Sequence, residues 1–297
     1  MSDPVIFTID IHPAGDNPPD GGWASTVHRV EADAPTLRVT DLGASRGDGV
    51  FETFGVIAGH PQSVAAHLAR LANSATLLEL PAPNEEQWRE AIRIAAATLP
   101  TEVQCGLKLV LTRGIEGTDR PTGWIVASVA GGDFAERRKG IRVVTLDRGY
   151  PSDIARRAPW LLAGAKTLSY AVNMAAQREA RRRGADDAIF VSSDGYVMEA
   201  PTSTVIIRRG DVFLTPRTDI GILPGTSQLA LFDFYRAAGL KAEEAVIPVA
   251  GLADADGLWL VSSVRLAAPI VQLDGATVTH DRDMTDRMNA ALLARDA

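Results

Sequence analysis

The apolar residues of this chain change their spacing along its length, and this pattern constrains the fold more than any other feature. Between residues 61 and 78 they recur every three or four positions, as on one face of an amphipathic helix. A second helix is expected from Asn84, which precedes acidic first-turn residues, to about Leu99. The runs "GLKLVLT" from Gly106 and "WIVASVA" from Trp124 are typical of strands.

The segment "GGDFAERRKG", residues 131–140, interrupts this patterning with glycine and charge, so a domain boundary is expected there. Residues 1–135 are predicted to form a smaller α+β domain. Its first part, 1–22, is expected to be an irregular extension, because residues 11–22 are rich in Pro, Gly and Asp. Residues 136–297 are predicted to form a strand-rich domain with helices packed outside it.

Within this second part, a strand is expected from Ile141 and a helix from about Ser169 to Arg183, stopped by Gly184. A further helix should open after Pro224 and close at Gly239. The remaining expected strands are "DAIFVS", "YVM", "STVIIR", "VFLT" and "LWLVSS". Strands and helices mixed in this way predict an α+β, two-domain protein.

Composition narrows the classes of function. A net charge of −7 argues against nucleic acid as the main partner, because phosphate backbones bind basic surfaces. No stretch approaches the roughly 20 apolar residues of a membrane span. Cys105 is the single cysteine, so neither an internal disulfide nor a cysteine-cluster metal site is expected. These observations predict a cytoplasmic protein without a metal.

Lys166 stands in "AGAKTLSYAVNMA", after small apolar residues and before a helical pattern. Poorly solvated surroundings disfavour the charged form of a lysine, and the neutral amine is the form that attacks a carbonyl. Lys166 is therefore a candidate Schiff-base lysine. The alternative is a solvated surface group, which is what most lysines are.

A candidate anion site follows Pro224, where Gly225, Thr226 and Ser227 begin a predicted helix. Free backbone N–H groups, the positive end of the helix dipole and two hydroxyls suit a phosphate, although plain N-capping explains the same residues. Ser263, which follows the apolar run "LWLV", could add a hydroxyl. Glu199, at the end of another predicted strand, is either a partner for a protonated ring nitrogen or a solvated carboxylate.

Arg70 in "HLARL" lies off the apolar stripe of its helix, as either a solvated residue or an anion ligand. In "GDGVFET" a tight turn is sufficient reason for Gly47 and Gly49. Taken singly, such motifs are ambiguous.

Their order along the chain is more informative. The strings "GDGVFET", "HLARL", "AKTLSYAVNMA", "MEAPTST", "GILPGTSQ" and "VSSVRLAAPI" together resemble the motif series of fold-type IV pyridoxal-phosphate enzymes, the D-amino-acid aminotransferase-like family. The resemblance extends from about residue 38 to residue 270. It implies a two-domain α+β fold, pyridoxal 5'-phosphate as cofactor and a homodimer.

The resemblance also implies roles for single residues. Lys166 would form the Schiff base with the cofactor, and Glu199 would face its pyridine nitrogen. Tyr170 would lie near the phenolate oxygen. Thr204 stands where the family usually has Asn, and Gln228 replaces a common arginine. The phosphate would be held by Arg70, Gly225, Thr226, Ser227 and Ser263.

Within the family, "FET" ending at Thr53 together with "GLKLVLTRG" is most similar to bacterial aminodeoxychorismate lyases. The Arg-x-His pair typical of D-amino-acid aminotransferases does not follow Arg113. The resemblance therefore implies a lyase that converts 4-amino-4-deoxychorismate into p-aminobenzoate and pyruvate, in folate biosynthesis. Thr53 would assist catalysis, and Lys108 and Arg120 would bind the substrate carboxylates. A D-amino-acid or branched-chain aminotransferase is the alternative, and a non-catalytic cofactor-binding relative is a more remote one.

Overall fold

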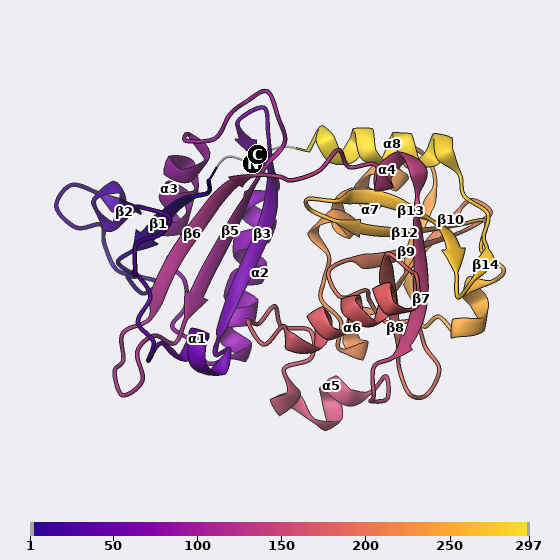
Figure 1. Ribbon diagram of the computed structural model, residues 1–297, viewed down its shortest axis with the longest axis horizontal. Coiled ribbons are helices and arrows are strands. Elements are labelled where there is room, and N and C mark those ends of the chain that lie inside the picture. The colour runs from indigo at the N-terminus through magenta and orange to yellow at the C-terminus, as the bar shows by residue number, and fades with distance from the viewer. Residues whose placement is uncertain (1–2, 296–297) are drawn as a thin grey trace. The chain divides into compact units, whose positions relative to one another are not determined.

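The computed structural model describes residues 3–295, which form two compact units (Figure 1). The first unit contains the chain up to Gly131 together with Ala165–Tyr170, and the second contains Gly132–Gly164 and Ala171–Arg295. This division lies four residues before the boundary expected between residues 135 and 136. The segment Ala165–Tyr170, which was expected in the C-terminal domain, packs with the first unit instead.

The first unit contains a six-stranded antiparallel sheet in the order β2-β1-β6-β5-β3-β4. Its strands are β1 Val5–Ile9, β2 Val27–Val30, β3 Gly49–Ile57, β4 His60–Pro61, β5 Cys105–Thr112 and β6 Thr122–Val129. Its helices are η1 Trp23–Thr26, α1 Leu42–Arg46, α2 Val64–Leu77 and α3 Glu85–Ala96.

One face of this sheet is covered by helices. The apolar stripe of α2 buries Leu71 and Ala75 completely, and alternate residues of β3, such as Val50 and Phe54, are equally buried. The expected cap of α3 is confirmed, because the Asn84 side chain accepts a hydrogen bond from the backbone N–H of Gln87. Such a cap contributes about 1 kcal/mol to helix stability.

The second unit contains a mixed sheet in the order β11-β10-β9-β12-β13-β7-β8, with β14 paired to β13. The pairs β10–β11, β13–β7 and β7–β8 are parallel, and the others are antiparallel. Its strands are β7 Ile141–Asp147, β8 Asp187–Val191, β9 Thr204–Arg209, β10 Val212–Pro216, β11 Lys241–Ala245, β12 Gly257–Ser262, β13 Leu266–Leu273 and β14 Ala276–Thr277. Its helices are α4 Glu136–Lys139, α5 Ile154–Arg157, η2 Pro159–Leu161, α6 Ala171–Arg182, η3 Thr218–Ile220, α7 Thr226–Ala237, η4 Val249–Leu252 and α8 Arg282–Leu293.

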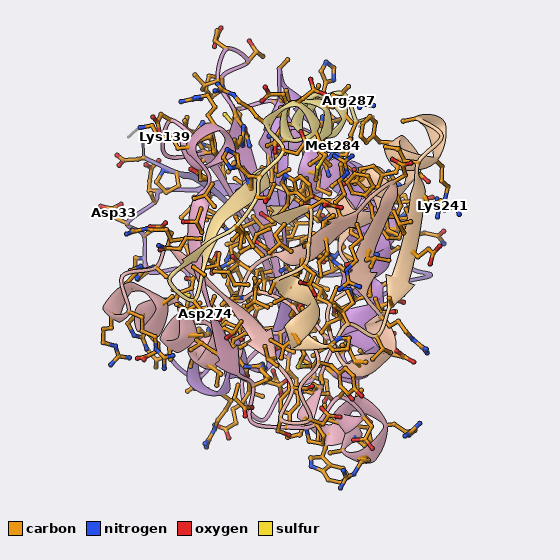
Figure 2. All side chains as sticks on the ribbon, turned by 90° about the vertical axis from the view of Figure 1, so that its right-hand side faces the viewer. Asp33, Lys139, Lys241, Asp274, Met284 and Arg287 are labelled. Carbon is orange, nitrogen blue, oxygen red and sulfur yellow. The ribbon has the colours of Figure 1, made fainter. Side chains whose placement is uncertain are left out.

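Both faces of this second sheet are buried. Val205 and Leu260 belong to one apolar cluster, whereas their neighbours Ile206 and Trp259 belong to another that includes residues of α7 and α8. Successive side chains of a strand point to opposite faces, so β9 and β12 separate two apolar layers. Met284 of α8, labelled in Figure 2, is one of the buried residues of the helical layer.

Two expectations for the second unit differ from the structure. The run "YVM" is not a strand, because Tyr196 and Val197 make only isolated bridges, to Pro248 and Val191. Helix α8 was not expected, although Asp281 caps it by accepting from the backbone N–H of Met284. Among residues 3–295, no helix is both long enough and apolar enough to cross a membrane.

Candidate active site

The backbone around Lys166 is attached to the first unit by three hydrogen bonds. The backbone N–H of Lys166 donates to Ser74 Oγ on α2 at 3.1 Å, and its carbonyl accepts from the N–H of Phe51 at 3.0 Å. The N–H of Leu168 donates to the carbonyl of Gly49 at 2.8 Å. A Cβ at Gly49 would lie 2.8 Å from the carbonyl oxygen of Leu111 on β5, so close packing requires glycine here. The segment therefore runs along the start of β3.

The Lys166 side chain lies over an aromatic ring. Its Nζ is 4.5 Å from the centre of the Phe51 ring, and Lys108 Nζ is 5.1 Å from the same centre. The ring of Tyr170 meets Phe51 edge to face, with 5.3 Å between the ring centres. Thr53 is the direct cross-strand neighbour of Lys108, so both side chains project from the same face of the sheet as Phe51.

The surroundings of the two lysines are partly shielded from water. Burial lowers the pKa of Lys108 below its ordinary value. Lys166 is half-buried beside the same ring. Two amines thus lie over the Phe51 ring, and Thr53 projects from the same face of the sheet, all within one unit of the chain.

Arg70 lies on the opposite, helix-covered face of the sheet. Its Nε and Nη2 donate to the two carboxylate oxygens of Glu52 at 2.8 and 2.7 Å, and His67 Nδ1 lies 2.7 Å from Glu52 Oε2. Glu52 and His67 are completely buried, and the Arg70 side chain is 11% exposed. Burial raises the pKa of Glu52, but the charge and hydrogen bonds of Arg70, with those of His67, outweigh it and hold the pKa at about 2. The expected contact between Arg70 and a phosphate stays a prediction.

Hydroxyl groups collect at the N-terminus of α7 in the second unit. Thr226 Oγ1 lies 3.1 Å from Ser263 Oγ, and Thr226, Ser227 and Ser263 are all buried. Gly225 supplies no side-chain cap, and a Cβ there would clash with Thr204 Oγ1. The first backbone N–H groups of a helix have no intrahelical partner. Hydroxyls and N–H groups that can donate hydrogen bonds therefore lie together at this helix start, next to Gly225, where a side chain would not fit.

Glu199 lies in the same unit as this helix start. Its Oε2 accepts a hydrogen bond at 3.1 Å from the backbone N–H of Leu223, two residues before Gly225. This contact orients the half-buried carboxylate relative to the segment that leads into α7.

The predicted residues fall into two groups. Lys166, Lys108, Thr53 and Tyr170 gather in the first unit; Glu199, Thr204, Gly225, Thr226, Ser227 and Ser263 lie in the second. Two predicted residues join neither group: Arg70 lies on the opposite face of the first sheet, and Arg120 is exposed in a loop.

The sequence motifs predicted no role for Glu52, His67 or Phe51. A signal for Glu52 was available, because it shares the buried face of β3 with Val50 and Phe54. A carboxylate in such a position needs a charged partner.

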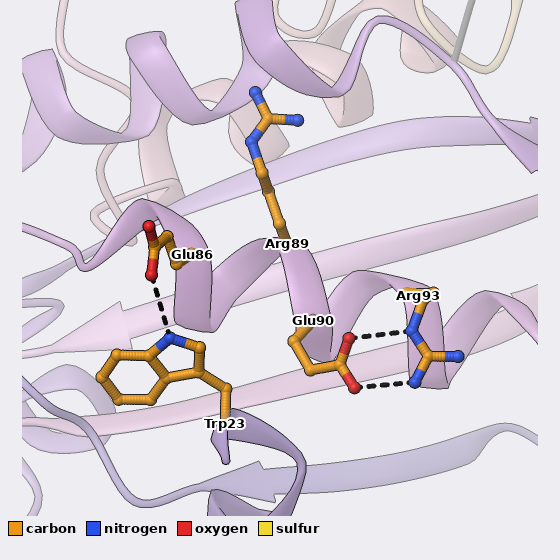
Figure 3. A pocket seen from close by; sticks show the side chains of 5 residues that line it. All are labelled: Trp23, Glu86, Arg89, Glu90 and Arg93. Carbon is orange, nitrogen blue, oxygen red and sulfur yellow. Dashed lines mark hydrogen bonds and ion pairs between the residues drawn. The ribbon is translucent and has the colours of Figure 1, made fainter. Parts of the chain in front are cut away.

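A hollow on the surface of the first unit lies at a different place (Figure 3). It is lined by Trp23, Glu86, Arg89, Glu90 and Arg93. Its polar groups are paired with one another or with neighbours: the indole N–H of Trp23 donates to Glu86, and Arg93 forms a bidentate ion pair with Glu90. None of the predicted site residues lines it. Within the described part of the chain, no group of three or more His, Cys, Asp or Glu residues could hold a metal ion.

In the first unit, an amine over an aromatic ring suits a carbonyl group, and in the second unit a hydroxyl-lined helix N-terminus suits a phosphate. Comparison with known proteins agrees with a cofactor that bears both groups. The family model described as amino-transferase class IV matches residues 49–273. The chain belongs to this family, whose enzymes depend on pyridoxal 5'-phosphate, and its fold is that of the fold-type IV enzymes.

Three relatives show how close the similarity is. A bifunctional aminodeoxychorismate lyase / D-amino acid transaminase of Mycobacterium tuberculosis is 47% identical over 81% of this chain and 87% of its own length. A fold IV transaminase of Curtobacterium pusillum is 50% identical, with a TM-score of 0.93 over 99% of this chain and 98% of that one. A hypothetical aminotransferase of M. tuberculosis in its pyridoxal-phosphate-bound form is 40% identical, with a TM-score of 0.88 over 97% of this chain and 98% of that one. The expected family, fold and cofactor are thereby confirmed.

Proposed function

We propose that this enzyme is a 4-amino-4-deoxychorismate lyase, which forms p-aminobenzoate and pyruvate for folate biosynthesis. The observation that carries the proposal is the grouping of Lys166, Lys108 and Thr53 around Phe51. In this grouping Lys166 would be the base, Lys108 the cation for a substrate carboxylate, and Thr53 the hydroxyl that assists the reaction. The bifunctional relative, whose name includes this lyase activity, supports the same assignment.

The donor groups of the chain fit the cofactor. Hydroxyls and N–H groups at the start of α7, with Thr226, Ser227 and Ser263, suit a phosphate dianion, and Arg70 would add a cation. Lys166 would carry the carbonyl as a Schiff base, and Glu199 would hold the pyridine nitrogen protonated. When bound, pyridoxal 5'-phosphate supplies an electron-accepting ring for carbanion chemistry.

The residues around Phe51 would perform the proton transfers. Lys166 Nζ, once released, would remove the proton from the ring carbon that bears the substrate amine. Loss of this proton would allow the carbon–oxygen bond to the enolpyruvyl group to break, so that this group would leave as pyruvate and the carbon ring would become aromatic. Thr53 would orient the leaving group or pass it a proton. Lys108 would bind one substrate carboxylate, and Arg120 stays a weaker candidate because its side chain is exposed.

Transamination of D-amino acids is the second candidate function. It is favoured by the second activity in the name of the M. tuberculosis relative, and by D-alanine aminotransferases of Listeria monocytogenes at 26% identity. A transaminase would use the same Lys166 but return the proton to the cofactor. Activity toward branched-chain amino acids is a weaker candidate.

The deciding experiment supplies aminodeoxychorismate without any amino acceptor. A lyase releases p-aminobenzoate and pyruvate in equal amounts over many turnovers, whereas a transaminase stops after about one equivalent because no keto acid is present to accept the amino group. Lys166→Ala is the control and should form no product. Transamination of D-alanine by a protein that forms no p-aminobenzoate would overturn the lyase assignment.

We further infer a homodimer in the cytoplasm. Trp160, Leu161 and Val172 of the second unit are large apolar residues with 74%, 52% and 59% of their surface exposed, as expected where a second copy could cover them. Cys105, buried and the single cysteine of the chain, is compatible with a reducing compartment.

A further inference from the structure

The last residue that the structure describes, Arg295, reaches the start of α7. It follows α8, which packs beside α7 in the second unit (Figure 1). Its Nε donates to the carbonyl of Leu292 at 2.8 Å, and its Nη1 donates to Ser227 Oγ at 3.3 Å. Ser227 is 2% exposed and lies in the first turn of α7. A guanidinium thus adjoins the buried hydroxyls of this helix start.

One nitrogen of this guanidinium has no acceptor. Arg295 Nη2 is buried and makes no hydrogen bond, and no ion pair within residues 3–295 includes Arg295. A buried cation without a carboxylate is costly unless an anion compensates it. Burial lowers the pKa of Arg295 to about 10, which still leaves it charged at neutral pH.

Apart from the Leu292 carbonyl, which Nε already binds, the group that Arg295 contacts at the start of α7 is a hydroxyl. Thr226 and Ser263 contribute hydroxyls, and the backbone N–H groups of the first turn of α7 point toward the same end of the helix. Positive charge, helix dipole and hydroxyls together favour an anion with several oxygens, because each oxygen accepts more than one hydrogen bond.

We propose that Arg295 is a further ligand of the cofactor phosphate, donating from Nη2 while Nη1 holds Ser227. The proposal rests on the placing of this phosphate at the start of α7. It assigns a binding role to a residue beyond the last helix, in a part of the chain that lies outside the segment matched by the family model.

A purely structural role is the competing explanation, because the bond to Leu292 also caps the end of α8. The test therefore uses Arg295→Met, which retains an apolar stem, with Arg282→Met as control. Arg282 is an exposed arginine at the other end of the same helix. Affinities for pyridoxal 5'-phosphate and for pyridoxal, which lacks the phosphate, are measured by titrating the cofactor-free proteins, and thermal unfolding is followed with and without inorganic phosphate.

A phosphate ligand predicts that Arg295→Met weakens binding of pyridoxal 5'-phosphate by about 10- to 100-fold and leaves binding of pyridoxal unchanged. Arg282→Met should change neither. Equal losses for both compounds, or no loss at all, would overturn the proposal. If the parent protein binds no pyridoxal phosphate, the proposed function fails separately. In that case the role of Arg295 is decided by the thermal stabilisation that inorganic phosphate gives. If Arg295→Met loses this stabilisation, Arg295 belongs to an anion site; if the variant retains it, Arg295 does not.

Discussion

At the scale of single residues, the most consequential contact is the buried group Glu52, His67 and Arg70. It joins a strand to a helix and holds the guanidinium that is proposed to bind the phosphate. Removing one member of a buried ion pair leaves an uncompensated charge and costs about 3–5 kcal/mol. An Arg70→Ala variant would therefore lower the stability of the protein as well as its affinity for the cofactor, and the two effects could not be told apart.

A pair of variants separates the two effects. Glu52→Gln should destabilise the protein, whereas the double variant Glu52→Gln/Arg70→Met removes both charges and should recover much of the stability. The double variant should nevertheless bind pyridoxal 5'-phosphate about 10- to 100-fold more weakly than Glu52→Gln, because Arg70 is gone. Denaturant unfolding and cofactor titration measure the two quantities. Equal cofactor affinities in the two variants would exclude a phosphate contact by Arg70.

The pH dependence of stability provides the control. The pKa of Glu52 is lower in the folded protein than its ordinary value of 4.5, so its contribution is present above that pH and is lost as the pH falls toward about 2. Glu52→Gln cannot titrate. As the pH falls from 4.5 toward about 2, the free energy of unfolding of the Glu52→Gln variant should therefore decline less than that of the parent protein.

At the scale of elements, the start of α7 depends on how closely β9 approaches it. Thr204, the first residue of β9, occupies the space that a side chain at Gly225 would need. With Thr204 in this position, any side chain at Gly225 would clash with the Thr204 hydroxyl.

Gly225→Ala tests this close approach. The added methyl group should clash with the Thr204 hydroxyl and cost about 1–3 kcal/mol of stability, as overpacking in a core does. The clash involves a single side chain. In a Thr204→Ala background, the Gly225→Ala substitution should therefore cost much less stability than it does in the parent protein. Thermal unfolding of the four proteins gives the coupling energy. Simple additivity would mean that the two residues are not in contact.

At the scale of the whole molecule, the residues proposed to hold the cofactor are divided between two compact units. Lys166 and Arg70 belong to the first, and Glu199 and Ser227 belong to the second. The chain achieves this division by returning Ala165–Tyr170 to the first unit after the second has begun. A cofactor bound by all four residues would link the stabilities of the units.

Hydrogen exchange can detect this linkage. Pyridoxal 5'-phosphate should slow exchange of backbone amides near the start of β3 in the first unit and near the start of α7 in the second, because ligand binding suppresses local opening. The cofactor-free protein with added pyridoxal, which lacks the phosphate, is the control and should show weaker protection at α7. Protection confined to one unit would contradict the proposed division of roles.

Local physical chemistry explains what the sequence determined by itself. Helix α2 follows from its apolar spacing, and helix α3 follows from the Asn84 cap and the acidic residues of its first turn. The order of short motifs identified the family, the fold and the cofactor. These features depend on residues near one another in the chain. Helix α8 was not predicted. Met284 and Met288 lie four residues apart on its buried face, a helical spacing that could have indicated it.

Only the tertiary structure decided which distant residues meet. Glu52 with Arg70, Lys108 with the Phe51 ring, and Arg295 with Ser227 are pairs whose members come from different helices, strands or segments. Their partners are selected by burial, since a charge removed from water must find a compensating group wherever the fold brings one. The sequence shows which side chains are polar, but the packing of sheet and helices determines which of these side chains are buried next to one another.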